Sequence, residues 1–229
     1  MPSIRNPRPN RQLSVRTLVA IALLLAVGDL SAEPLPSFDR LDLRGAVDVT
    51  IERSDRPGVQ ILSQQHLAAR TEIEVSDGVL YVTAPKGEKI MLAVQTPLLE
   101  EVLVRGEATV RADRVTGSQL VLDSRGTSAF DIRSVQVGEL AMVGSGAAVF
   151  RVSGHAERQI IDLDGTGQVD AQNLVSRSSE VRVRGAGDVY LQAREHLAVD
   201  VAGAAKVTYF GSPVVARNIR GVGIVRAVR

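Results

Sequence analysis

The stretch Arg184-Gly-Ala-Gly-Asp-Val-Tyr-Leu191 (RGAGDVYL) contains a pattern that recurs along the chain. The pattern is glycine, any residue, a small residue, any residue, Val or Phe, any residue, and then an apolar residue or alanine. Recurrence at a nearly fixed period is typical of a repeat architecture. The clustered copies are 20, 20, 19, 20, 18 and 18 residues apart, and one outlying copy precedes them. The copies begin at Gly45 (the outlier), Gly106, Gly126, Gly146, Gly165, Gly185, Gly203 and Gly221.

The residues around each glycine alternate in polarity. When the glycine is position 0, positions −4, −2, +4 and +6 are mostly apolar. Because alternate residues of a strand face the same side, these positions predict a buried face and the intervening ones an exposed face. Position +2 is Ala, Ser or Gly in every clustered copy, which suits a crowded corner. The glycine itself indicates a positive φ or a close approach of two backbones.

A repeat of about 20 residues cannot bury its own apolar face, so successive repeats must stack. The sequence therefore predicts an all-β, single-domain β-solenoid, similar to a right-handed β-helix, in which each coil of 18–20 residues holds two short strands and two turns. We assign the regular repeats to residues 105–229 and a less regular β region to residues 33–104. No linker separates the two, so residues 33–229 are expected to share one core.

The N-terminus has the features of a secretory signal peptide over residues 1–32. A basic segment precedes a ten-residue apolar run from Leu18 to Val27, and Gly-Asp-Leu-Ser-Ala follows over residues 28–32, with cleavage expected after the small residue Ala32. Cleavage after Gly28 is the alternative. The run is shorter than the roughly 20 residues that span a bilayer, and no later stretch is as apolar. We expect an exported protein without a membrane span in its mature chain, periplasmic, secreted or on the cell surface.

The composition argues against several classes of function. Lys plus Arg number 27 and Asp plus Glu 26, so the net charge of +1 gives no reason to expect a nucleic-acid partner. Cysteine is absent, which excludes disulfides and thiolate metal sites. The three histidines have no partner at metal-ligand spacing, and the glycine-rich phrases lack the features of nucleotide-binding loops. We therefore predict no cofactor, no metal ion and no catalytic residue.

Position +5 of the repeats is expected to face outward, and its first four clustered copies alternate in charge. Opposite charges side by side on neighbouring strands stabilise a sheet by roughly 0.2–1 kcal/mol per pair, so the alternation has a structural explanation as well as a functional one. As a candidate binding face we take this row together with one residue that faces outward in RGAGDVYL. Its members are Arg111, Asp131, Arg151, Asp170, Asp188 and Tyr190.

Several phrases resemble the head GIN domain of putative autotransporter adhesins. They are SFDRLDLRGAVDVTIERSD at the start, LDGTGQVDA and RGAGDVYL in the repeats, and YFGSP near the end. The similarity extends from about Phe38 to Val225. It implies a β-solenoid of exported proteins with a suggested role in adhesion, and it brings no catalytic motif. The copies at Gly106 and Gly126 depart from the family pattern because they lack its second glycine.

These observations predict an exported, non-enzymatic, adhesin-like or cell-envelope binding scaffold that uses an extended strand face. Its partner would be an envelope or extracellular protein or glycan. One alternative is a polysaccharide-acting enzyme, because Asp123, Asp162 and Asp200 share one repeat position. The first two would lie roughly 9–10 Å apart, near the carboxylate separation of inverting glycosidases. The other alternative is a structural protein that self-assembles, as a homo-oligomer, through the ends of its solenoid.

Overall fold

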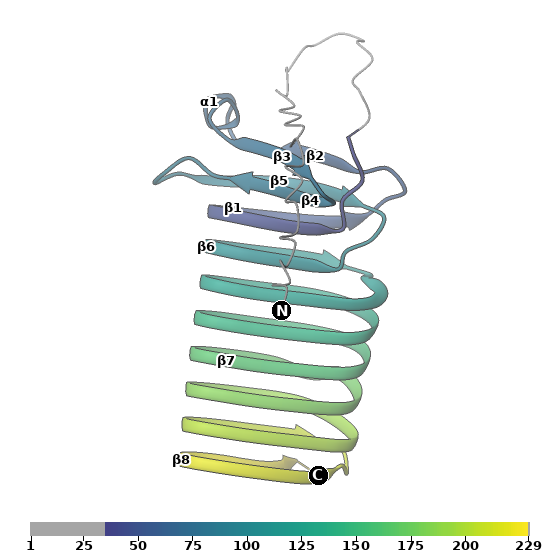
Figure 1. Ribbon diagram of the computed structural model, residues 1–229, viewed down its shortest axis with the longest axis vertical. Helices are drawn as coiled ribbons and strands as arrows, with labels where there is room; N and C mark the ends of the chain where they lie inside the picture. The colour runs from purple at the N-terminus through teal and green to yellow at the C-terminus, as the bar shows by residue number, and fades with distance from the viewer. Residues whose placement is uncertain (1–34, 229) are drawn as a thin grey trace, which may run out of the picture.

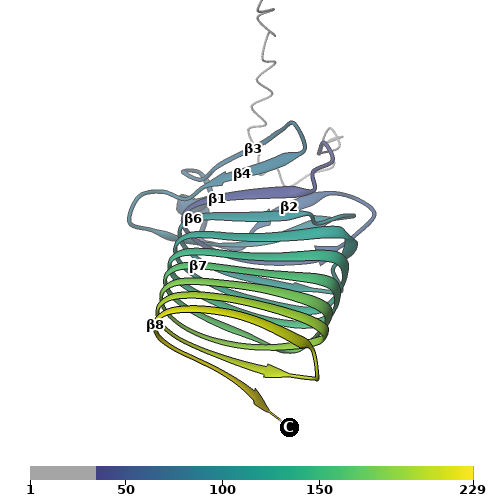
Figure 2. The same ribbon diagram turned by 60° about the horizontal axis from the view of Figure 1, so that its bottom comes forward.

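Successive turns of the chain stack on one another in the computed structural model, which describes residues 35–228 (Figures 1 and 2). The eight strands of this described part of the chain belong to one sheet, which confirms the all-β prediction. The predicted signal peptide lies outside the described residues. Within residues 35–228, no helix has the length and apolar character needed to cross a membrane. The elements are β1 (Arg40–Arg53), β2 (Gly58–Ile61), α1 (Gln65–Ala68), β3 (Glu72–Ser76), β4 (Val79–Thr83), β5 (Lys89–Thr96), β6 (Glu101–Asp113), β7 (Thr116–Phe210) and β8 (Val214–Val228).

The repeat glycines set the register of the stack. β6 pairs with β7, and β7 with β8, in parallel, with Gly106 opposite Gly126 and Gly203 opposite Gly221. Inside β7, which is 95 residues long, each repeat glycine lies against the backbone of the preceding one. All eight repeat glycines have a φ between 90° and 150°, a range that side-chain-bearing residues rarely adopt. We call each repeat, centred on its glycine, a rung, and residues at one repeat position form a column along the stack.

The outlying copy at Gly45 is a regular rung. β1 pairs in parallel with β6, and Gly45 lies opposite Gly106. The chain between them forms the N-terminal end of the stack: β4 and β5 pair in parallel with the two halves of β1. β3 and β2 then pair antiparallel with β4 and β5. The irregular region expected before residue 105 is therefore confined to the segment between β1 and β6.

The inner columns form one continuous hydrophobic core. At position +4, all residues from Val110 to Val207 are fully buried, and the rings of Phe130 and Phe150 stack with their centroids 5.0 Å apart. The pattern weakens at the C-terminal end. Arg217, at an inward position, is exposed because β8 has no neighbour on its outer side among the described residues. Tyr209, expected to be buried, is partly exposed. Thr208, expected to face solvent, is 1% exposed and accepts a hydrogen bond from Arg226 of β8, whose side chain lies against it.

Candidate binding groove and charged face

A groove with a volume of about 870 Å³ crosses the rungs next to the column of glycines. It extends from Glu107 on β6 to Ile224 on β8 and is lined by positions +1, +2 and +3. The small residue at +2 lets the bent backbone approach the core, while the outward residues at +1 and +3 form two walls. Seven rungs at the usual spacing of parallel strands give the groove a length of about 29 Å.

The walls of the groove change in character along the stack. Polar side chains predominate near β6, polar and apolar side chains are equally frequent in the middle, and the walls end in Val222 and Ile224, which are 79% and 57% exposed. The surface thus offers hydroxyl, amide and carboxylate groups interspersed with methyl groups. From β6 to β8, the first wall consists of Glu107, Thr127, Ala147, Thr166, Ala186, Ala204 and Val222, and the second of Thr109, Ala129, Val149, Gln168, Asp188, Lys206 and Ile224.

The structure places the predicted charged row in consecutive rungs beside this groove. Arg111 and Asp131 are partners in the sheet register. The pKa of Asp131 lies below its ordinary value, first because Arg133 donates hydrogen bonds to it and further because of the charges of Arg133, Arg151 and Arg111. The direct ion pair of Asp131 is with Arg133 of the same rung, at 2.8 Å. Within residues 35–228, Arg111 and Arg151 are exposed and form no ion pair, so both guanidinium groups are available to a partner.

The remaining members of the face lie nearer the C-terminal end. Asp170 is half-buried at position +5, and Asp188 is exposed and lines the groove. The Nζ atom of Lys206 lies 6.0 Å from the centre of the Tyr190 ring, within the range of a cation–π contact. Sequence reasoning did not include Lys206, although it shares the +3 column with Asp188 and follows it by one rung. The structure therefore adds a cation to the predicted face.

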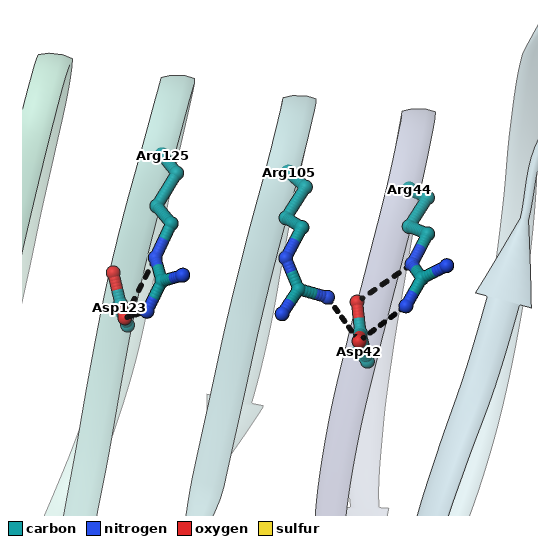
Figure 3. A network of polar contacts seen from close by, with 5 residues as sticks. All are labelled: Asp42, Arg44, Arg105, Asp123 and Arg125. Carbon is teal, nitrogen blue, oxygen red and sulfur yellow. Dashed lines mark hydrogen bonds and ion pairs between the residues drawn. The ribbon is translucent and has the colours of Figure 1, made fainter.

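A second set of charges lies at positions −3 and −1, and sequence reasoning identified the acids at −3 of the clustered copies but missed their arginine partners at −1. Asp42 is buried and pairs with Arg44 of its own strand, at 3.1 Å, and with Arg105 of the next rung (Figure 3). Arg105 has Leu103, not an acid, two residues before it, so its side chain extends to the preceding rung. By contrast, Arg125 pairs with Asp123 of its own rung (Figure 3).

Further along the stack, an arginine again pairs with an acid of the preceding rung. Arg184 pairs with Asp162 of the preceding rung at 3.2 Å. Arg182 shares the −3 column with Asp162 and follows it by one rung, but its ion pair is with Glu180 of its own strand. At position −1 the recurring signal is an acid two residues before the arginine, and where the rung lacks that acid, the arginine pairs with the acid of the preceding rung.

Asp42 provides a prediction for stability in acid. Burial alone would raise the pKa of Asp42, but the hydrogen bonds from Arg44 and Arg105 outweigh it and hold the pKa below its ordinary value. The stabilisation is therefore present above about pH 4, the pKa of an unfolded Asp, and is lost as the pH falls through the folded value. Asp42→Asn should lower the free energy of unfolding by about 2 kcal/mol at pH 7 and by much less at pH 2.

Urea unfolding at the two pH values measures this difference. Asp55→Asn is the matched control, because Asp55 is exposed and forms no ion pair within the described part of the chain. An equal loss of stability at both pH values would contradict the account of Asp42.

The three aspartates on which the enzymatic alternative depends all form ion pairs with arginines. Asp123, Asp162 and Asp200 pair with Arg125, Arg184 and Arg220. None of these three carboxylates is among the residues that line the groove. Across residues 35–228, no three His, Asp or Glu side chains are arranged to hold a metal ion. The geometry of this column thus gives the enzymatic alternative no support.

Comparisons with known proteins agree with this description. Residues 37–213 match the family described as "putative auto-transporter adhesin, head GIN domain". No curated protein matches the chain. Among solved structures, a putative adhesin from Bacteroides fragilis NCTC 9343 is similar with a TM-score of 0.80 and 22% identity, over 86% of this chain and 94% of that one.

Two further structures share the fold at lower similarity. A putative lipid binding protein from Parabacteroides distasonis ATCC 8503 has a TM-score of 0.65 and 17% identity, over 86% of this chain and 95% of that one. A putative adhesin from Parabacteroides merdae ATCC 43184 has a TM-score of 0.59 and 18% identity, over 86% and 94%. The family match covers most of the chain and confirms the resemblance seen in its repeats. The chain belongs to the head GIN domain family of putative auto-transporter adhesins.

Proposed function

We propose that this protein is an exported, non-enzymatic binding scaffold of the bacterial envelope or cell surface, adhesin-like in action. In this proposal the stacked rungs are those of a right-handed β-solenoid, and the residues that bind lie along its length. The observation that carries the proposal is the groove across seven rungs, with the charged row beside it. The name of the family and the predicted signal peptide support the location.

The mechanism rests on a rigid surface with repeated contacts. Parallel backbone ladders hold each rung in register, so the groove walls are in place before a partner arrives. A preorganised surface avoids much of the entropy loss that accompanies the ordering of loops on binding. Each wall position supplies only a weak contact, and a partner that extends across several rungs sums them. A linear glycan or an extended stretch of an envelope protein has the required shape.

A lipid is the second candidate ligand. One similar structure is named a putative lipid binding protein, and the groove of the present chain ends in the exposed side chains of Val222 and Ile224. Alanine methyl groups continue this apolar surface toward the middle of the groove. Glu107, Gln168 and Asp188 on the walls are less suited to an acyl chain, because polar groups lose hydration when apolar groups cover them. We therefore favour a polar polymer.

A screen with defined ligands distinguishes these functions. The purified mature chain is tested for binding to neutral and acidic glycans, to purified envelope proteins and to phosphatidylcholine and phosphatidylglycerol vesicles, and each glycan is also checked for cleavage. We expect binding to a glycan or a protein without turnover. Cleavage that disappears in Asp123→Asn or Asp162→Asn would overturn the proposal in favour of an enzyme. Binding to vesicles alone would favour the lipid function.

A further inference from the structure

The two ends of the stack expose apolar side chains. The large apolar residues that are most exposed in residues 35–228 are Leu62 and Met91 at the N-terminal end and Val214, Val222 and Ile224 on β8. Leu62 and Met91 are 52% and 50% exposed. Elsewhere in the described chain, large apolar side chains are mostly buried in the core. Exposed apolar residues that cluster, rather than occur singly, mark contact surfaces.

Within residues 35–228, both ends also have strands with one free edge. β8 pairs only with β7, and β2 and β3 each pair with a single strand, β5 and β4. The outer backbone N–H and C=O groups of such strands can accept a further strand. Each end therefore has the backbone groups needed to continue the sheet.

The two ends match in outline when the register is followed through the stack. Through β4, β3 lies over residues 40–44 of β1, which hold the same rung positions as residues 216–220 of β8. Through β5, β2 lies over residues 49–52, which correspond to residues 225–228. The two short strands at one end, β3 and β2, therefore share their rung positions with residues 216–220 and 225–228 of β8 at the other end.

The side chains of the two ends are complementary in the same register. Glu72 on β3 is in the column of Arg44, and at the far end of that column stands Arg220. Both are exposed. Met91 lies in the +3 column, which ends at Ile224. The Leu62 backbone N–H donates to the carbonyl of Met91, so Leu62 is adjacent to this column. If the two ends of different molecules met in this register, Glu72 would lie opposite Arg220, and Met91 would lie near Ile224.

We propose that a second copy of this chain docks head to tail, with β8 of one molecule against β2 and β3 of the next. The contact uses different surfaces on the two molecules, so it does not close and can continue into a filament. α1 projects beyond β2 and β3 (Figure 1), and none of its residues is fully buried, so an incoming copy that displaces it would have to cover only the partly buried Leu67, which packs against the core.

Pairing of β8 with another β8 is the competing arrangement. β8 contains Arg217, Arg220 and Arg226 and no acidic residue. Two copies of β8 would bring these arginines together, and within residues 35–228 only Arg220 has a carboxylate partner, Asp200, so the charges of Arg217 and Arg226 oppose association. The head-to-tail arrangement instead places a glutamate in the column of Arg220. Charge complementarity therefore favours contact between unlike ends.

Sedimentation velocity tests this assembly with the purified mature chain alone. Between about 1 and 200 μM, where small interfaces associate, we expect reversible growth beyond a dimer. Ile224→Lys blocks one end and Leu62→Lys the other, and each variant alone should remain monomeric. Their equimolar mixture should form a dimer and nothing larger, because each variant keeps one intact and complementary end. Arg220→Glu should weaken assembly about fivefold, and added Glu72→Arg should restore it.

Two results would overturn the proposal. One is a wild-type protein that remains monomeric at the highest concentration. The other is a dimer that Ile224→Lys abolishes and Leu62→Lys leaves intact, since this pattern belongs to β8 paired with β8. Circular dichroism of each variant checks that it is folded. No other ligand is present, so the outcome is independent of the proposed binding function.

Discussion

Gly185→Ala is expected to destabilise the fold by about 4 kcal/mol. Gly185 has a φ of 125°, which alanine adopts only with strain, and a methyl group there would overlap the carbonyl oxygen of Gly165 in the preceding rung. That oxygen belongs to a backbone held by the ladder, so it cannot move aside as a flexible side chain would. Urea unfolding followed by circular dichroism measures the loss.

Substitutions at two other glycines distinguish the cost of backbone strain from the cost of overlap with the preceding rung. Gly87 has a φ of 79° and nothing within 4 Å of an added methyl group, so Gly87→Ala should cost only the backbone strain, about 1 kcal/mol. Gly187, two residues after Gly185, has an ordinary φ, and an added methyl group would lie 3.0 Å from the carbonyl oxygen of Gly167, a tight contact but a longer one than the overlap at Gly185. The same position is Ala108, Ala148 and Ala205 in other rungs. Gly187→Ala should therefore also cost about 1 kcal/mol. Equal losses at Gly185 and Gly87 would show that close stacking of the backbones is unimportant.

Phe130→Ala should lower the free energy of unfolding by about 4 kcal/mol. Phe130 is fully buried, and its ring stacks on that of Phe150 with an angle of 8° between the planes. Removal of the ring leaves a cavity inside a stack whose neighbouring rungs are held by backbone hydrogen bonds and cannot collapse into it. Thermal unfolding provides the measurement.

Conservative and paired substitutions control this prediction. Phe130→Leu keeps most of the apolar volume and should cost about 1.5 kcal/mol. In a double-mutant cycle, Phe130→Ala and Phe150→Ala should be non-additive by about 1 kcal/mol, because each removes the same ring–ring contact. Strict additivity would mean that the two rings contribute separately, as ordinary buried surface.

The repeat glycines and the inner columns could be predicted from sequence because both depend on local pattern. A glycine every 18–20 residues and apolar residues at alternate positions define the register without knowledge of the partner rung. The Asp77-Gly78 turn between β3 and β4 follows from the same kind of signal, since both residues have a positive φ. Gly45 looked isolated only because the β2–β5 segment separates it in sequence from the rung against which it packs.

The features that sequence reasoning missed depend on contacts between rungs and on the shape of the folded backbone. Arg105 and Arg184 reach across to the preceding rung, a choice that requires both rungs to be compared. Arg217 is exposed because the stack of described rungs ends there, although its column is apolar in every clustered rung before it. The groove arises from the bend of the backbone at positions 0 to +2. The sequence shows the small residue at +2, but not the hollow that forms outside it.

The measurement that tests the binding scaffold most directly is a calorimetric titration of the ligand found by the screen. The wild type is compared with the double variant Arg151→Asp, Asp170→Arg, which exchanges two charges of the face and keeps the net charge. The control is Arg177→Glu, Glu195→Arg, an exchange within an exposed ion pair that is not part of the groove or the row. We predict a Kd at least about tenfold higher for the face variant and an unchanged Kd for the control. Equal affinity of all three folded proteins would contradict the claim that this face binds the partner.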